Sequence, residues 1–321
     1  MKFITYLENN KEKIGLAIED SYYSLEKINP NLPKGVIEIL SDYDANIPLF
    51  QQIEKEINIG HYVDAQIKIP HLLAPIPHPK SFRDAYAFRQ HVETSRLNRG
   101  LEMIPEFDEF PVFYFSNHQA IQGPGTIYPM PEHFNQLDFE LEVAIVIKKK
   151  GINIKAEEAD DYIGGFMILN DLSARALRMQ EMKLNLGPAK GKDFATSMGP
   201  YLVTPDELLP YLVEPQTNHI GNAYNLKMTC KVNDHNVSEG NLKDMHWTFA
   251  EIIERISYGV MLYPGDIIGS GTVGTGCFLE INGTKKRENP AYEAKWLEAG
   301  DSIEMEVSGL GKLVNLIHKN F

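Results

Sequence analysis

Cysteine is scarce in this chain of 321 residues, which holds only Cys230 and Cys277. Both stand in apolar, strand-like surroundings, and their spacing is not that of a cysteine metal site. We therefore expect two reduced core residues and a reducing compartment. The sequence also lacks an apolar run of membrane-spanning length, and its first residues carry charges where a signal peptide would have an apolar core. These absences predict a cytoplasmic protein.

Positive charge is also in short supply. The chain has 31 Lys and Arg against 44 Asp and Glu, which gives a net charge of -13 at pH 7. Nucleic acids and anionic membranes need a basic surface, so we expect neither as a partner. A small anionic substrate stays possible, because a bound cation can reverse the sign of the potential inside one pocket.

Proline marks a division of the chain near residue 75. Positions 70, 75, 77 and 79 are all proline, so Ile69–Lys80 should be an extended linker. Residues 1–74 then form a small N-terminal α/β domain, and residues 75–321 form the larger domain. The small domain should contain strands at Lys2–Tyr6, Ile14–Ile18 and Tyr22–Leu25, and helices around Val36–Ile39 and Leu49–Ile57.

Short apolar stretches separated by Gly, Pro and Asn dominate residues 75–321. The absence of regular βαβ alternation predicts an α+β fold that is mainly β, with a mixed sheet rolled on itself. The expected strands are Val112–Phe115, Leu141–Ile147, Gly165–Leu169, Leu226–Val232, Asp266–Gly269, Phe278–Ile281 and Ser302–Val307. The expected helices are Ser81–Leu97, Glu157–Tyr162, Ser173–Met182 and Phe249–Ile256.

The stretch Leu137–Ile147, LDFELEVAIVI, places acidic residues in an otherwise apolar strand. Side chains alternate along a strand, so Glu140 and Glu142 point to the same face. Burying two carboxylates together is costly unless a positive group lies between them, and a hard cation bound by oxygen ligands is one solution. The alternative is that this face is simply exposed to solvent.

Two further stretches carry candidate site residues. In FMILNDLSAR an apolar strand ends at Asp171, where a scaffold gives way to a loop, although a turn or helix-capping role is the ordinary explanation. In SFRDAYAFRQH, read as a helix, Asp84 and His91 are two turns apart and lie on one side. The alternative there is a surface helix whose Arg83 and Arg89 form ion pairs.

Taken together, the segments DAYAFRQH, FELEVAIV, NDLSAR, GKDF and SGT followed by FLEI resemble the fumarylacetoacetate hydrolase family of carbon–carbon hydrolases, in unbroken order from Lys80 to the C-terminus. The resemblance implies a mixed β-roll catalytic domain behind a smaller N-terminal domain, and a homodimer. It also implies one Mg²⁺ or Ca²⁺, with Mn²⁺ possible, held by Asp84, Glu140, Glu142 and Asp171. Such an all-oxygen ligand set suits a hard cation.

The resemblance also assigns catalytic roles. It pairs a catalytic His91 with Glu280, and it places Lys192 near the metal and the leaving group. Relatives that act as acylpyruvases instead have a lid glutamate three residues after the histidine, where this chain has Thr94, so the sequence looks nearer to fumarylacetoacetase. The substrate contacts implied are Tyr86, Tyr114, Arg175, Thr196 and Thr272.

Some positions depart from the pattern or have ordinary explanations. Arg178 stands where fumarylacetoacetase has a glutamine, Ala195 where a glycine is usual, and Arg99 lies one position from the family's second substrate arginine. Three of the assigned residues could instead have structural roles. Arg175 could form an ion pair with Asp171 or Glu181. Glu280 could be a strand-edge carboxylate, and Lys192 could lie in a surface turn. The departures affect substrate contacts rather than the metal ligands.

The predicted activity is hydrolysis of a carbon–carbon bond in a β-diketone acid such as fumarylacetoacetate or an acylpyruvate, which would belong to aromatic amino acid catabolism. His91, oriented by Glu280, would deprotonate the attacking water, and Lys192 would stabilise the oxyanion or protonate the departing carbanion. The alternative on the same metal site is a decarboxylase, isomerase or hydratase of a 2-oxo acid. A third possibility is a binding module that kept the scaffold without catalysis.

Overall fold

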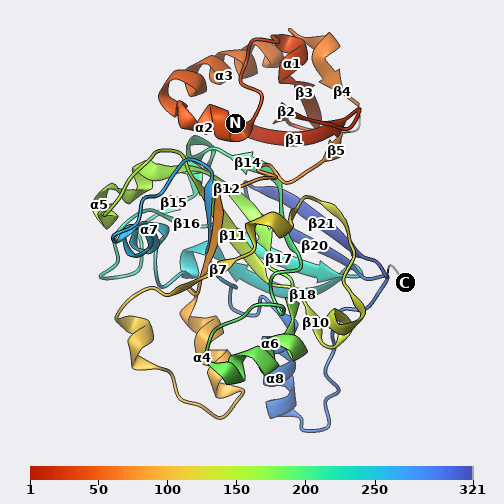
Figure 1. The fold of residues 1–321 in the computed structure, drawn as a ribbon, viewed down its shortest axis with the longest axis vertical. Helices are drawn as coiled ribbons and strands as arrows, with labels where there is room; N and C mark the ends of the chain where they lie inside the picture. Colours follow the sequence, from red (N-terminus) through yellow and green to blue (C-terminus); the bar gives the residue numbers. More distant parts are fainter. Residues whose placement is uncertain (69, 320–321) are drawn as a thin grey trace.

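The computed structural model describes residues 1–68 and 70–319 and shows a small N-terminal unit above a larger body (Figure 1). The unit begins with the hairpin of β1 (Lys2–Glu8) and β2 (Lys11–Ile18). Its turn falls at Asn9 and Asn10, which both adopt positive φ, as asparagine does more readily than most residues. The remaining elements of the unit are β3 (Ser21–Ser24), α1 (Leu25–Ile28), α2 (Val36–Ser41), α3 (Tyr43–Asn58), η1 (Val63–Ala65), β4 (Gln66–Ile67) and β5 (His71–Leu72). Ile69, the first residue of the expected linker, lies outside the described residues.

One sheet runs from the N-terminal unit into the larger body. Its main path has the order β4-β3-β2-β1-β14-β12-β11-β19-β6-β7. The strands of the body are β14 (Thr196–Val203), β12 (Ile163–Asn170), β11 (Leu141–Ile147), β19 (Asp266–Gly269), β6 (Ser81–Ala85) and β7 (Phe113–Ser116). The two units join at β1 and β14, where Phe3 lies opposite Leu202. The division into domains 1–74 and 75–321 stays a prediction, since the two parts share this sheet.

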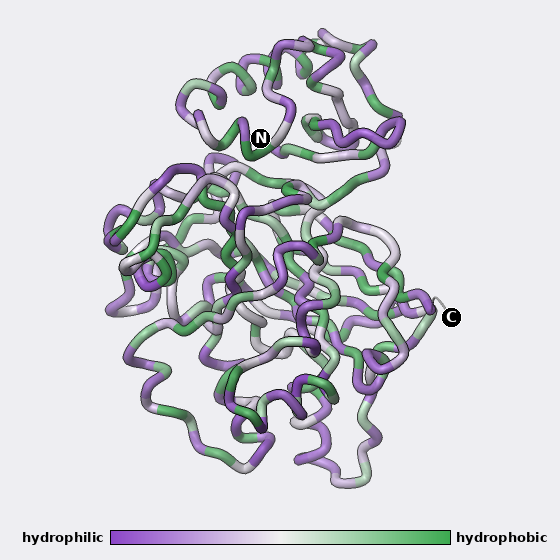
Figure 2. The backbone as a smooth tube through the Cα atoms, viewed as in Figure 1, coloured by the Kyte–Doolittle hydropathy of each residue, from purple (hydrophilic) through white to green (hydrophobic). Residues whose placement is uncertain are grey.

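A second sheet folds over the first. Its order is β18-β17-β20-β21-β9, formed by β18 (His235–Asn241), β17 (Lys227–Val232), β20 (Ser302–Val307), β21 (Gly311–Ile317) and β9 (Gly125–Ile127). Strand β11, which belongs to the first sheet, is buried on both of its faces. Val143 and Ile145 pack in the core of the larger body, while Ala144 and Val146 pack in a second core with residues of the N-terminal unit. Figure 2 shows this apolar centre among more hydrophilic loops. The predicted mixed, rolled α+β fold is confirmed.

Among residues 70–319, the α-helices around the body are α4 (Arg89–Leu97), α5 (Ala156–Ala159), α6 (Arg175–Glu181), α7 (Phe249–Ser257) and α8 (Phe278–Glu288). The predicted apolar face of α7 is confirmed, with Phe249, Ile252 and Ile253 all buried. The shorter elements are β8 (Ile121–Gln122), β10 (Leu137–Asp138), β13 (Ser173–Ala174), β15 (Leu212–Val213), β16 (Ala223–Tyr224), η2 (Pro105–Asp108), η3 (His118–Ala120), η4 (Pro131–Phe134), η5 (Asp160–Tyr162), η6 (Met182–Leu184), η7 (Pro205–Tyr211) and η8 (Leu242–Asp244).

Two predicted elements are wrong. Ser81–Leu97 is helical only from Arg89, because Ser81–Ala85 instead pairs in parallel with β19 as strand β6. Phe278–Ile281 is the first turn of α8 rather than a strand. The first error arises where strand pairing overrides helical spacing, and the second where a short apolar run does not distinguish strand from helix. Strands β14 and β21 were not predicted.

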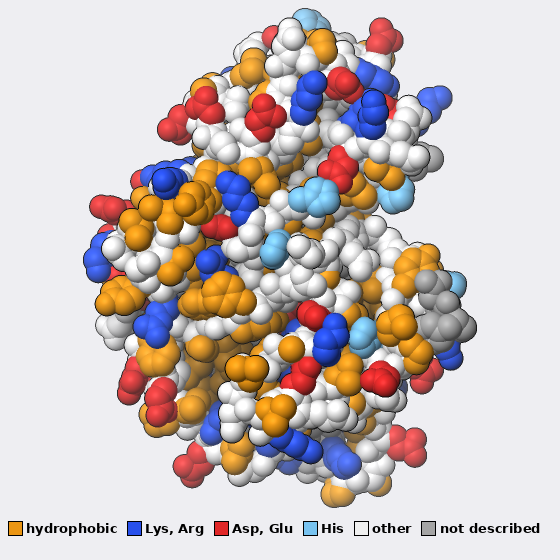
Figure 3. All heavy atoms as spheres, in the orientation of Figure 1, with side chains coloured by type: hydrophobic (Ala, Val, Ile, Leu, Met, Phe, Trp, Pro, Cys, Tyr) orange, Lys and Arg blue, Asp and Glu red, His pale blue; other side chains and the backbone are white. Residues whose placement is uncertain are grey.

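Acidic and basic side chains are interspersed on the face drawn in Figure 3, rather than gathered in one basic patch. Within residues 1–68 and 70–319, no helix is long and apolar enough to cross a membrane. Cys230 and Cys277 are both buried and free.

The shared core generates a stability prediction. Phe3 is fully buried and meets Phe50 edge to face, with ring centroids 5.3 Å apart. Phe3→Ala should lower the free energy of unfolding by about 3–5 kcal/mol. Because its cluster includes residues of both units, far-UV circular dichroism and the fluorescence of Trp247 and Trp296, both in the larger body, should report one coincident denaturant transition at a lower midpoint.

Ile59→Ala is the matched control, since the Ile59 side chain is 74% exposed. It should change the free energy of unfolding by no more than about 0.5 kcal/mol. Two separate transitions for the N-terminal unit and the body would contradict the shared core.

Candidate active site

Three carboxylates from different strands converge inside the larger body. Asp84 comes from β6, Glu142 from β11 and Asp171 from the end of β12, and one oxygen of each lies within 4.8 Å of the others. All three are buried. Gly269 on β19 makes room for this arrangement, because a Cβ there would lie 2.3 Å from Asp84 Oδ1. The sheet order thus brings together residues that are far apart in sequence.

Two of these carboxylates, Asp84 and Glu142, form no ion pair with the described residues. Burial, followed by repulsion from Asp171, raises the pKa of Asp84 to about 8. Burial, followed by the charge of Asp84, raises the pKa of Glu142 well above its usual range. Thr272 donates a hydrogen bond to Glu142 Oε1 at 3.2 Å, but Glu142 Oε2 is buried without a hydrogen-bond partner among the described residues. An unpaired oxygen in an all-oxygen cluster fits a hard divalent cation.

Glu140, the fourth predicted ligand, is held by two cations. Lys192 Nζ pairs with Glu140 and lies 2.5 Å from Asp171 Oδ2, and Arg175 lies 2.8 Å from Glu140 Oε1. Burial alone would raise the pKa of Glu140, but the charges of Lys192 and Arg175 outweigh it and hold the pKa well below its usual range. Glu140, Glu142 and Lys192 are all buried. The two alternatives, a solvent-exposed face for the glutamates and a surface turn for the lysine, are therefore wrong.

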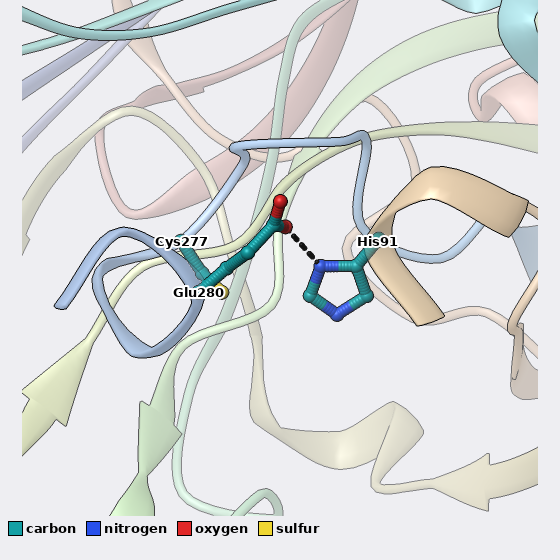
Figure 4. A group of neighbouring side chains, drawn as sticks. All are labelled: His91, Cys277 and Glu280. Carbon is teal, nitrogen blue, oxygen red and sulfur yellow. Dashed lines mark hydrogen bonds and ion pairs between the residues drawn. The ribbon is translucent and has the colours of Figure 1, made fainter. Parts of the chain in front are cut away.

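A histidine–glutamate pair lies on two neighbouring helices. His91 Nδ1 on α4 is 2.6 Å from Glu280 Oε2 on α8 (Figure 4). The other oxygen, Glu280 Oε1, accepts the backbone N–H of Thr275 at 3.0 Å. Asn98, which caps α4, donates its side-chain amide to the Glu280 carbonyl at 3.0 Å. Glu280 is therefore not a strand-edge carboxylate, and the two helices are fixed against each other at this pair.

Arg175 and Asp138 form a buried ion pair that the sequence did not predict. Arg175 is 1% exposed and lies 2.7 Å from Asp138, rather than beside the Asp171 or Glu181 suggested by its position. Asp138 also accepts the backbone N–H groups of Phe278 at 2.7 Å and Leu279 at 2.9 Å, at the start of α8. Asp138 thus connects the helix that carries Glu280 to the arginine that holds Glu140. The signal for Asp138 in the sequence was its place in the same stretch, Leu137–Ile147, as Glu140 and Glu142.

The other predicted contacts lie around the same carboxylates. Tyr114 donates its hydroxyl to Asp171 at 2.5 Å, and Thr196 donates to the same carboxylate at 3.2 Å. Burial, then the charge of Asp171, raises the pKa of Tyr114 well above its usual range. The Tyr86 ring meets the His91 ring edge to face at 5.8 Å. The structure therefore brings the predicted site residues together, while their catalytic and binding roles stay predictions.

Arginines near the site differ in their surroundings. Arg178 on α6 is half-buried, and no carboxylate of the described residues pairs with it. Burial raises the pKa of Tyr86, and the positive charge of Arg178 partly offsets that rise. The same charge lowers the pKa of Glu140, so Arg178 lies near both residues. Arg99 is exposed and donates to the Ser95 carbonyl at 3.1 Å. Arg89 pairs with Asp108, whereas Arg83 is buried on β6.

The rolled sheets enclose both the buried carboxylates and the His91–Glu280 pair. The model of the family described as Fumarylacetoacetate (FAA) hydrolase C-terminal matches residues 80–318. The chain belongs to the fumarylacetoacetate hydrolase family, and the resemblance seen in its motifs is confirmed.

Relatives give a finer comparison. Oxaloacetate tautomerase YisK of Bacillus subtilis is 29% identical over 332 aligned positions, which cover 99% of this chain and 100% of that protein. The human mitochondrial oxaloacetate tautomerase FAHD2A is 31% identical over 208 positions, covering 64% of this chain and only 59% of that protein. Both relatives are named as oxaloacetate tautomerases, and neither as a fumarylacetoacetase.

Solved structures show the same fold. The fumarylacetoacetate hydrolase of Exiguobacterium antarcticum matches with a TM-score of 0.70 and 21% identity, covering both chains fully. Maleylpyruvate hydrolase of Sphingobium sp. SYK-6, in complex with manganese(II) and pyruvate, matches with a TM-score of 0.68 and 19% identity, also over both full chains. At such identities the likeness supports the fold alone.

The buried ion pair generates a prediction about stability. Asp138→Asn should lower the free energy of unfolding by about 3–5 kcal/mol, because Arg175 keeps its buried charge after losing a partner. Adding Arg175→Met should recover part of this loss, and a double-mutant cycle measured by denaturant unfolding should give a coupling above about 1 kcal/mol. Asp193→Asn is the control, because Asp193 pairs with the exposed Lys190 and the change should cost about 1 kcal/mol or less. A coupling near zero would contradict the connecting role of Asp138.

Proposed function

We propose that this chain catalyses the metal-dependent tautomerisation of oxaloacetate or a closely similar 2-oxo dicarboxylate. The observation that carries the proposal is the His91–Glu280 pair, joined through Asp138 and Arg175 to a buried carboxylate cluster. Keto–enol exchange needs a group that moves a proton and a site that favours enolate charge. The full-length similarity to a Bacillus subtilis oxaloacetate tautomerase supports this choice over the hydrolysis predicted from the motifs.

The metal site would be formed by the predicted ligands. Asp84, Glu142 and Asp171 would hold the cation, with Glu140 released toward it from Lys192. Mg²⁺, Ca²⁺ and Mn²⁺ all suit oxygen ligands. When bound, a divalent cation supplies Lewis-acid polarisation of the 2-oxo group.

His91 would carry the proton. Its Nδ1 faces Glu280, so Nδ1 carries the hydrogen and Nε2 is the free basic nitrogen. Nε2 removes a proton from the carbon next to the 2-oxo group, and the proton is delivered to the carbonyl oxygen, so that one C–H bond breaks and one O–H bond forms. Lys192, buried beside the carboxylates, would stabilise the negative charge on that oxygen during the transfer.

Arg178 would bind the second carboxylate of the substrate. It is half-buried, faces the region of Tyr86 and Glu140, and has no carboxylate partner among the residues the structure describes. Gly191, the neighbour of Lys192, packs against it closely, since a Cβ at Gly191 would lie 2.7 Å from the Arg178 Cβ. An unpaired guanidinium near the site suits a dicarboxylate.

Carbon–carbon hydrolysis of an acylpyruvate is the second candidate. The same His91–Glu280 hydrogen bond could orient the imidazole to deprotonate a water. Oxaloacetate decarboxylation would use the same cation site with no need for a water nucleophile. The proposed substrate therefore has to be tested against acetylpyruvate and fumarylacetoacetate, with pyruvate formation from oxaloacetate measured in parallel.

The central experiment follows the enol absorbance of oxaloacetate with Mg²⁺ present. His91→Ala and Glu142→Gln should each lower turnover by about 100-fold or more, through loss of the proton-transfer group or of a metal ligand. Isothermal titration with Mn²⁺ should separate them, because His91→Ala keeps metal binding and Glu142→Gln loses it. Full turnover by His91→Ala would exclude it as the base. A higher kcat/KM for acetylpyruvate hydrolysis than for oxaloacetate tautomerisation would overturn the proposed reaction.

Arg178→Gln tests the substrate class. It should raise the KM for oxaloacetate by about tenfold, because an ionic hydrogen bond is lost. The KM for 2-oxobutyrate, followed by deuterium exchange at its third carbon, should stay nearly constant because that acid lacks the second carboxylate. Arg287→Gln, which removes an exposed charge on the last turn of α8, is the control. An equal effect of Arg178→Gln on both acids would remove Arg178 from the substrate site.

A further inference from the structure

Cys277 forms a second cluster of possible metal ligands with the histidine–glutamate pair. One ligand atom each of His91, Cys277 and Glu280 lies within 4.8 Å of the others, and all three residues are buried. Cys277 precedes the first turn of α8 and Glu280 lies in that turn, so both side chains come from one helix start. Figure 4 shows the cysteine beside the glutamate, with the His91 ring facing them from α4.

The donors of this cluster differ from those of the carboxylate site. Asp84, Glu142 and Asp171 offer only oxygen, which suits a hard cation. The second cluster offers sulfur, nitrogen and oxygen, a set that selects zinc and similar soft cations. Bond lengths of about 2.0–2.3 Å place the ligand atoms of a tetrahedral Zn²⁺ roughly 3–4 Å apart. The three ligand atoms here all lie within 4.8 Å of one another, so small side-chain rotations would bring them to that spacing. Water would fill the fourth position.

We propose that His91, Cys277 and Glu280 form an inhibitory site for a soft divalent cation of the zinc class. On binding, the thiol S–H bond breaks and its proton passes to solvent, the hydrogen of His91 Nδ1 moves to Nε2 so that the ring stays neutral, and the sulfur, Nδ1 and a carboxylate oxygen of Glu280 bond the cation. His91 then has no freedom to transfer a proton. The inhibitory part rests on the proposed function of His91, whereas the binding part does not.

Cys230 provides a matched control within the same chain. It is as fully buried as Cys277 and lies on β17, outside both groups of metal-ligating side chains found among the described residues. Cys230→Ser therefore removes the other thiol and keeps the cluster, while Cys277→Ser removes the sulfur ligand. Glu142→Gln impairs the carboxylate site and leaves the cluster unchanged.

The binding test uses Cd²⁺ alone, added to metal-free protein, and measures the ultraviolet charge-transfer absorption of a cadmium–thiolate bond. Wild-type protein, Cys230→Ser and Glu142→Gln should show the absorption, and Cys277→Ser should lose it. Zn²⁺ affinity, measured by competition with a chromophoric chelator, should fall in Cys277→Ser by at least the roughly 10- to 100-fold that loss of an outer-shell partner costs. Absence of the absorption from wild-type protein, or its persistence in Cys277→Ser, would overturn the site.

The inhibition test adds Zn²⁺ to enzyme already turning over oxaloacetate with Mg²⁺. Wild-type and Cys230→Ser enzyme should lose activity and regain it when a chelator selective for Zn²⁺ over Mg²⁺ is added. Cys277→Ser, compared with its own zinc-free rate, should need at least about tenfold more Zn²⁺ for the same loss. Cadmium–thiolate absorption with zinc-insensitive turnover would overturn the inhibitory role. Absent oxaloacetate turnover would instead count against the proposed function, because the cadmium absorption does not depend on catalysis.

Discussion

The burial of several carboxylates within one sheet is the constraint on which this structure depends. An ionised carboxylate loses several kcal/mol of hydration free energy when it is buried, so each needs a partner or stays protonated. Glu140 is balanced by Lys192 and Arg175, whereas Asp84 and Glu142 are left with raised pKa values. This unequal compensation explains why the cluster suits a divalent cation: half of the site is already neutralised, and the other half is not.

The same constraint connects the two parts of the site. A buried Arg175 needs carboxylate partners, and it has two. Glu140 lies beside the carboxylate cluster, and Asp138 contacts the start of α8. Since Asp138 also accepts two N–H groups of that helix, the position of Glu280 depends on the ion pair that steadies Glu140. Breaking one partner of such a pair is far more costly than never forming it. A single buried network therefore sets both the carboxylates and the acid–base pair.

The sequence revealed different parts of this arrangement to different degrees. Strand β11 was predicted with its observed bounds, because a long apolar run leaves little ambiguity. Asp84 was grouped with Glu142 and Asp171, beside which it lies, but it was placed on a helix. Residues 81–91 show helical spacing, whereas parallel pairing with β19 makes residues 81–85 a strand. The four residues Phe278–Ile281 were too few to separate strand from helix. Asp138 was not among the predicted site residues, because a contact with backbone N–H groups far away in sequence leaves no local pattern.

The distribution of charge in the site suits one general kind of chemistry, but it does not select one particular reaction. In the proposed function, the carboxylates, Lys192 and the His91–Glu280 pair would form a site for enolate chemistry, which tautomerisation, decarboxylation and hydrolysis all require. Selection among these reactions has to come from groups that touch the rest of the substrate. We propose Arg178 as such a group, because it departs from the fumarylacetoacetase pattern and has no carboxylate partner among the described residues. Because no carboxylate among the described residues balances its charge, the Arg178 guanidinium is available to bind a carboxylate of the substrate. A 2-oxo dicarboxylate offers a second carboxylate for this contact, whereas the acyl group of an acylpyruvate is uncharged.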